Sequence, residues 1–137
     1  MNRLTLKYEL DLDFVLIAIT SQLKDYMLCF KINKQLNIHF YKIDELIIDS
    51  NLNRSCFSRY HYQIPESEAN LFLIANKGDT GHLIPEMKRV DYFLIIREYI
   101  GEEDVEQLID GINKLPEVLA AIEVDPRRLK SKENLIF

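Results

Sequence analysis

With 137 residues, of which 47% are apolar and 28% charged, the chain is long enough to bury one sizeable core and too short for two ordinary domains. Its formal net charge of -5 repels phosphate backbones and anionic lipid heads, so we expect it to bind neither nucleic acid nor membrane. No apolar run approaches the ~20 residues that span a bilayer, and the first residues lack the apolar block of a signal peptide, so we expect a cytoplasmic protein. Two cysteines are too few for a disulfide framework, so we expect reduced thiols.

The first third of the chain predicts a strand followed by a helix. Residues 4–12 alternate between apolar and polar side chains, which is typical of a half-buried strand. The apolar block 14–19 fits either a short helix or a continuing strand, and we favour a helical turn. A helix follows over residues 21–36, capped by the hydroxyl of Thr20 or Ser21. Its inward stripe is predicted from apolar side chains at three- and four-residue spacing, namely Leu23, Tyr26, Met27 and Phe30.

The middle of the chain predicts consecutive strands. Residues 38–43 open a strand, residues 44–48 form a second short apolar patch, and residues 49–53 contain turn-forming side chains. Residues 57–63 and the continuously apolar run 71–75 are separated by a turn, so we expect them to form a hairpin.

The last third predicts a strand, a helix and a strand. A continuously apolar strand begins at Tyr92, and the helix 102–114 has apolar residues at i, i+3, i+4 and i+7, acidic residues in its first turn and Pro116 after its end. Residues 118–124 give a final strand. These three elements are close enough in sequence to form a split or adjacent right-handed βαβ unit.

Taken together, the elements favour an α+β fold. We predict a two-layer sandwich in which a mainly antiparallel sheet of about six strands packs against two main helices, at about 21–36 and 102–114. We expect a single domain over residues 1–126. Residues 127–137 contain four basic side chains and an apolar end, and we expect a solvated C-terminal tail; a tail that docks on a partner or on a second copy is the functional alternative.

One short motif stands out between the middle and last strands. Its six positions are Ile84, Pro85, Glu86, Val90, Asp91 and Tyr92. The segment resembles the signature of the IPExxxVDY family of small bacterial (Bacteroidetes-type) proteins. Further positions of the first helix look similar to that family's pattern, namely Asp25-Tyr26, Leu28-Cys29, Asn33 and Leu36. The resemblance implies a family whose molecular function is uncharacterised, so it supplies no mechanism.

The motif places two carboxylates in a defined bend ahead of a buried strand, because Pro85 restricts the backbone there. Glu86 and Asp91 could act as an acid and base pair, or could hold backbone N–H groups and Arg89 or Arg97. We favour the structural interpretation, because no nucleophile or phosphate-binding loop is evident nearby.

Two further residues are weaker site candidates. His82 lies just ahead of the motif and is kept as a site candidate, although we favour a surface loop histidine as the explanation. Asn33 falls on the predicted inward stripe, where a hydrogen bond to a loop backbone is a better explanation than ligand contact. The histidines and cysteines show no CxxC or HxxxH spacing, so we predict no metal site, no cofactor and no catalytic residue.

These observations favour a non-enzymatic protein-binding or regulatory module. We expect it to use a sheet face or edge to contact an unidentified protein partner or a second copy of itself. The alternative is a small-ligand binder or enzyme that uses Glu86 and Asp91, with His82, around a cleft.

Overall fold

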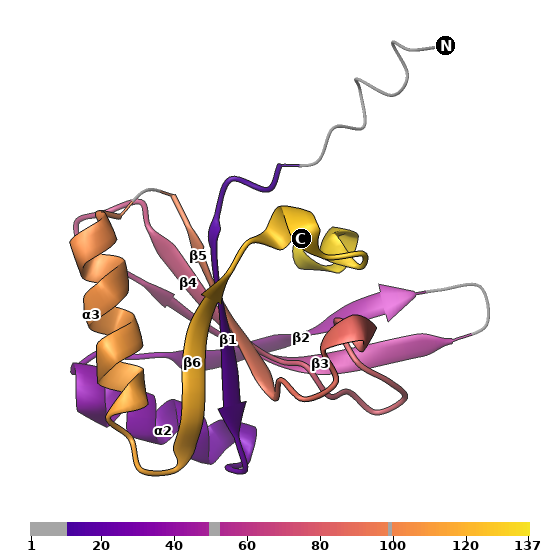
Figure 1. Ribbon diagram of the computed structural model, residues 1–137, viewed down its shortest axis with the longest axis horizontal. Coiled ribbons are helices and arrows are strands. Elements are labelled where there is room, and N and C mark those ends of the chain that lie inside the picture. Colours follow the sequence, from indigo (N-terminus) through magenta and orange to yellow (C-terminus); the bar gives the residue numbers. More distant parts are fainter. Residues whose placement is uncertain (1–10, 50–52, 99) are drawn as a thin grey trace, which may run out of the picture.

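The computed structural model describes residues 11–49, 53–98 and 100–137. Six strands form a single sheet in the order β2-β3-β4-β5-β1-β6, and each neighbouring pair is antiparallel. The strands are β1 (Val15–Ser21), β2 (Tyr41–Asp49), β3 (Arg54–Gln63), β4 (Asn70–Ala75), β5 (Tyr92–Arg97) and β6 (Val118–Val124). The helices are α2 (Asp25–Leu36) and α3 (Glu102–Asn113), with short 3-10 turns η1 (Pro85–Met87), η2 (Pro126–Arg128) and η3 (Lys132–Leu135) (Figure 1).

The predicted α+β class is confirmed, and α2 and α3 cover one face of the sheet. Leu28 and Ile32 of α2 and Ile112 of α3 are fully buried in a cluster with inward side chains of the strands. Where the two helices meet, a Cβ on Gly111 would run into the side chain of Leu36. Glycine at this position therefore allows the close approach of α3 to α2.

The second face of the sheet carries its own apolar cluster. It is covered by the connection between β4 and β5 (residues 76–91, the β4–β5 connection) and by residues 126–137 (the C-terminal segment). Leu83, Ile84 and Leu135 are fully buried there, and Leu129 is nearly so. Residues 127–137 thus pack on the sheet, contrary to the expected solvated tail. The basic side chains between Leu129 and Leu135 conceal this in the sequence, because the buried positions are few and separated.

The strands β5 and β6 and the helix α3 between them form the split version of the predicted βαβ unit. Both β5 and β6 pair with β1 and run antiparallel to it, so they are parallel to each other with one strand between them. The helix α3 makes the crossover. The predicted hairpin is also confirmed, since β3 and β4 pair antiparallel with Tyr60 opposite Leu73.

The helical turn predicted over residues 14–19 is wrong. Most of this block lies in β1, which has a neighbour on each side and apolar clusters on both faces. Ile17 and Ile19 enter the cluster under the helices, and Leu16 and Ala18 enter the cluster on the second face. A strand buried on both faces needs apolar side chains at every position, so it loses the alternation that distinguishes a strand from a helix.

Other boundaries also differ from the prediction. Ser21 ends β1 and does not cap α2, whose N-cap is Lys24. The patches 38–43 and 44–48 belong largely to one strand, β2, whose pairing is irregular between Ile43 and Leu46. Residues 4–10 of the predicted strand 4–12 lie outside the described residues. Residues 50–52 of the predicted loop 49–53 lie outside them as well. Among the described residues, no helix is long and apolar enough to cross a membrane.

Candidate functional site

The motif is organised by a residue that sequence analysis did not single out, Asn76. Its side chain is fully buried, and its Nδ2 donates to the backbone oxygens of Met87 at 2.9 Å and Val90 at 2.7 Å. Its Oδ1 accepts from the backbone N–H of Ile84 at 2.8 Å, and its own N–H donates to the backbone oxygen of Asp91 at 2.9 Å. One amide side chain therefore satisfies three backbone groups of the β4–β5 connection.

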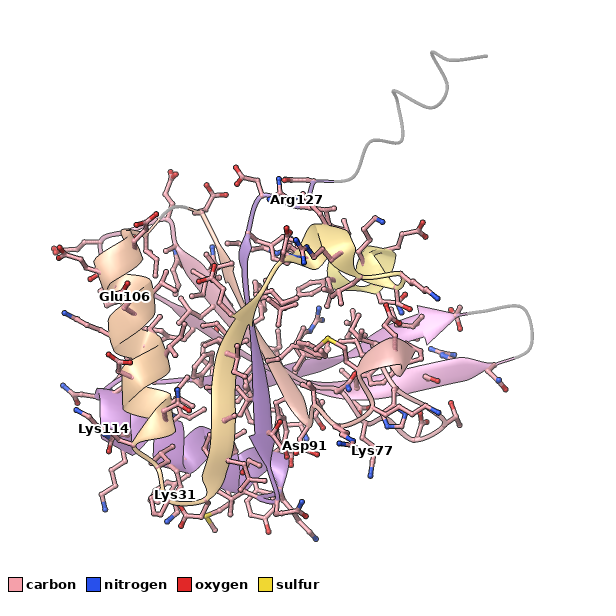
Figure 2. The ribbon with its side chains drawn as sticks, in the orientation of Figure 1. Lys31, Lys77, Asp91, Glu106, Lys114 and Arg127 are labelled. Atoms are coloured by element: carbon pink, nitrogen blue, oxygen red, sulfur yellow. The ribbon has the colours of Figure 1, made fainter. Side chains whose placement is uncertain are left out.

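The second half of the motif holds the connection between β1 and α2. The Oδ2 of Asp91 accepts from the backbone N–H of Ser21 at 2.8 Å. The Oη of Tyr92 donates to the backbone oxygen of Leu23 at 2.6 Å, and burial raises the pKa of this hydroxyl to about 12, so it remains a donor at neutral pH. Figure 2 labels Asp91 where β1 ends, close to Lys77 of the β4–β5 connection.

The first half of the motif holds the C-terminal segment. Pro85 begins η1, and the Glu86 carboxylate accepts from both the backbone N–H and the Oγ of Ser131, each at 2.8 Å. Glu86 is exposed, and the slight desolvation of its carboxylate would raise its pKa, but hydrogen bonds from Ser131 and from neighbouring backbone N–H groups outweigh this effect and leave the pKa below its ordinary value. The charged carboxylate is therefore the form that binds Ser131.

Each motif carboxylate thus binds a different segment that is distant in the sequence. Glu86 reaches the C-terminal segment and Asp91 reaches the end of β1, and both accept from backbone N–H groups. Arg97, one of the two predicted partners, donates to the backbone oxygens of Leu135 and Phe137. This geometry corresponds to the structural interpretation of the motif, and it joins three parts of the chain at one junction.

The two weaker candidates also have structural contacts. His82 pairs with Lys77 in an isolated bridge that closes the loop between them. Asn33 accepts from the backbone N–H of Phe40 at 2.7 Å and donates to its oxygen at 3.0 Å, which confirms the predicted tie to a loop backbone. Asn113 of α3 makes the same pair of bonds to Ala121 of β6 at 2.8 and 3.0 Å.

The best-formed surface hollows in the part of the chain that the structure describes do not involve the motif carboxylates. Three surface hollows of about 920, 690 and 550 Å³ have linings that include none of Glu86, Asp91 and His82. In the part of the chain that the structure describes, no group of three or more His, Cys, Asp or Glu side chains is placed to hold a metal ion. The small-ligand alternative therefore gains no support from the surroundings of these residues.

The outer face of α2 carries an exposed apolar surface that sequence analysis placed inside. Tyr26 is 59% exposed, Phe30 58% and Met27 37%, whereas the inward positions are Leu28, Cys29 and Ile32. The Nζ of Lys34 lies 6.0 Å from the centre of the Phe30 ring. We call these four exposed side chains the α2 patch: Tyr26, Met27, Phe30 and Lys34. Beside it, Lys31 forms an ion pair with Glu117 at 2.9 Å, where α2 meets the start of β6 (Figure 2).

Two comparisons with known proteins add no family. No protein-family model matches the chain, and no curated protein matches its sequence. The resemblance of Ile84–Tyr92 to the IPExxxVDY family therefore stays a prediction.

Proposed function

We propose that this chain is a cytoplasmic, non-enzymatic protein-binding or regulatory module whose contact surface is the α2 patch. The observation that carries the proposal is the exposure of two aromatic rings one helical turn apart, Tyr26 at 59% and Phe30 at 58%. The proposed partner is a second copy of the chain or another protein.

The composition of the patch supports this role. Tyr, Phe and Met are enriched at the buried centres of protein interfaces, and a group of exposed apolar side chains marks an interaction surface more often than scattered single ones do. Covering the Tyr26 and Phe30 rings would remove apolar area from water, which is the main favourable term in association. Lys24 and Lys34 place positive charge at this helix in an otherwise acidic chain, which favours a partner with acidic side chains around an apolar centre.

The motif has a supporting part in this proposal. Asp91 and Tyr92 hold Ser21 and Leu23, which directly precede α2. Asp25, the first residue of α2, accepts a hydrogen bond from Tyr60 of β3 at 3.1 Å. These bonds fix the start of the helix against the sheet, and a preorganised surface binds with less loss of conformational entropy.

The test compares the parent chain with a Tyr26→Ser/Phe30→Ser variant and with Ile122→Ser as a matched control. Ile122 is 60% exposed on β6, so its replacement removes a similar apolar group from another surface. Sedimentation equilibrium measures self-association, and affinity capture from native lysate with mass spectrometry measures other partners.

We expect the dimer or the captured protein to be lost in the double variant and kept in the control, with unchanged melting temperatures. A strictly monomeric parent that captures no protein would contradict the proposal. Association that survives the double variant would also contradict it.

A further inference from the structure

Three side chains on neighbouring strands form a hydrogen-bonded chain on the second face of the sheet. The Oη of Tyr41 lies 2.9 Å from the Nδ1 of His61, and the Nε2 of His61 lies 2.7 Å from the Oδ1 of Asn70. Tyr41 and His61 are paired across β2 and β3, and His61 is paired with Phe72 across β3 and β4. The register of the sheet therefore places these groups together.

The direction of each bond follows from the last member of the chain. The Nδ2 of Asn70 donates to the backbone oxygen of Glu68 at 3.0 Å, so its Oδ1 faces His61 as an acceptor. The Nε2 of His61 must then carry the proton, which leaves Nδ1 as the acceptor for the Tyr41 hydroxyl. The neutral imidazole is thus held in the tautomer that can remove a proton from Tyr41.

Ring contacts hold the imidazole in place. The ring centres of His61 and Phe72 are 4.8 Å apart, and Tyr41 meets His61 edge to face at 5.6 Å. Arg59 lies two residues before His61 on the same face, and the guanidinium of Arg97 lies 5.8 Å from the Phe72 ring. Both guanidinium groups have partners of their own, since Arg59 donates to the backbone oxygen of Asp44 and Arg97 donates to the backbone oxygens of Leu135 and Phe137, so neither is assigned a part in the reaction.

A hydroxyl, a base within hydrogen-bond distance and a third group that orients the base are the parts of an activated nucleophile. We propose that Tyr41 is a nucleophilic tyrosine that accepts an acyl group from an electrophilic acyl donor. This inference goes beyond the proposed binding function and does not depend on it.

The step balances within these groups. The Oη of Tyr41 attacks the carbonyl carbon of the donor, and its proton passes to Nδ1 of His61. The bond from that carbon to the leaving group then breaks, and the proton passes from His61 to the leaving group. The product is an O-acyl tyrosine ester. Asn70 is a positioning residue in this scheme, since it contacts His61 and not the reacting atoms.

The exposure of the Tyr41 hydroxyl to solvent would not by itself make it react faster than a free tyrosine hydroxyl. Tyr41 is 56% exposed, so an unactivated hydroxyl there should react more slowly than that of free N-acetyltyrosinamide. A rate above that of the free amide therefore requires activation by the neighbouring groups. A positioned general base typically contributes about 10²–10⁴-fold to the rate of a reaction, and we expect at least about tenfold at this solvent-exposed position.

The experiment treats the full chain with N-acetylimidazole in the presence of N-acetyltyrosinamide and follows acetylation of each tyrosine by peptide mass spectrometry. Tyr41 should react at least about tenfold faster than the free amide. His61→Phe keeps a ring between Tyr41 and Phe72 but removes the base, so it should reduce the Tyr41 rate below that of the free amide. Asn70→Leu should reduce the rate as well, and Asn70→Asp, which keeps the acceptor, should restore it.

Melting temperatures of all variants show whether each one remains folded. A Tyr41 rate at or below that of the free amide in the parent chain would overturn the proposal without any variant. An unchanged rate in a folded His61→Phe protein would overturn it as well.

Discussion

Asn76→Leu tests the claim that one buried amide organises the motif. Leucine has the same number of side-chain heavy atoms as asparagine and branches at the same atom, but its two methyl groups are bulkier and can neither donate nor accept a hydrogen bond. The substitution leaves three backbone groups without their partner, namely the N–H of Ile84 and the oxygens of Met87 and Val90. A large destabilisation is expected, because buried polar groups without partners are costly.

The size of the effect follows from the burial of each bond. An unsatisfied buried group costs about 1–3 kcal/mol, and the bond to Ile84 is fully buried, so we assign it about 2 kcal/mol. The bonds to Met87 and Val90 are partly buried, and water can replace them in part, so we assign each about 0.5–1 kcal/mol. The sum is about 3–4 kcal/mol, a large share of the 5–15 kcal/mol typical of a domain.

Urea unfolding at pH 7 measures the loss, and Asn113→Leu is the matched control. Asn113 makes two partly buried bonds to Ala121, so by the same assignment its replacement should cost only about 1–2 kcal/mol. Asn76→Asp separates hydrogen bonding from packing. It keeps the acceptor for Ile84 but turns a carboxylate toward two carbonyl oxygens, which raises the folded-state pKa, so its stability should fall as the pH rises from 4 to 7. A loss for Asn76→Leu no greater than for Asn113→Leu would refute the reasoning.

Three smaller effects follow from the same contacts. A Cβ at Gly78 would lie 2.7 Å from the backbone oxygen of Cys56, whereas the atom nearest to a Cβ at Gly81 would be 3.9 Å away. In urea unfolding, Gly78→Ala should therefore lower the free energy of unfolding by about 1–3 kcal/mol, and Gly81→Ala should lower it by less than about 0.5 kcal/mol. The pKa of Glu86 is lower in the folded chain than its ordinary value of 4.5, so Glu86→Gln should lower the urea midpoint of unfolding at pH 7. The difference between the midpoints of the variant and the parent should shrink as the pH falls through that lowered pKa, and a difference that does not depend on pH would contradict this origin. Tyr92→Phe removes the 2.6 Å bond to the β1–α2 connection and should cost about 1 kcal/mol by thermal unfolding, and an unchanged melting temperature would contradict that estimate.

Sequence patterns predicted most of the fold because the elements at the periphery expose one side to water. In α3 an apolar stripe faces the sheet and acidic residues face outward, and the structure places the helix at Glu102–Asn113. The pattern failed in β1, where both faces are buried, and in α2, which has two apolar stripes. One stripe, which contains Leu28, Cys29 and Ile32, faces the sheet. The other, which contains Tyr26 and Phe30, faces outward. Periodicity gives the direction of a helix only when one face is polar.

The candidate site was predictable in part. The motif could be read as a bend with two carboxylates that hold backbone groups, because Pro85 and the strand after it restrict the chain. Their partners, Ser131 and Ser21, lie 45 and 70 residues away, and local sequence carries no information on such long-range bonds. Asn76 had one local signal, since it is a polar residue directly after the apolar strand β4.

Site-specific photocrosslinking at the α2 patch tests the proposed contact surface most directly. A photoreactive phenylalanine analogue replaces Phe30 in one protein and Ile122 in another, and both are irradiated in the producing cells. We predict a crosslinked species, either a dimer of this chain or a complex with one other protein, from position 30 and none from position 122. Crosslinks that form from position 122 but not from position 30 would contradict it.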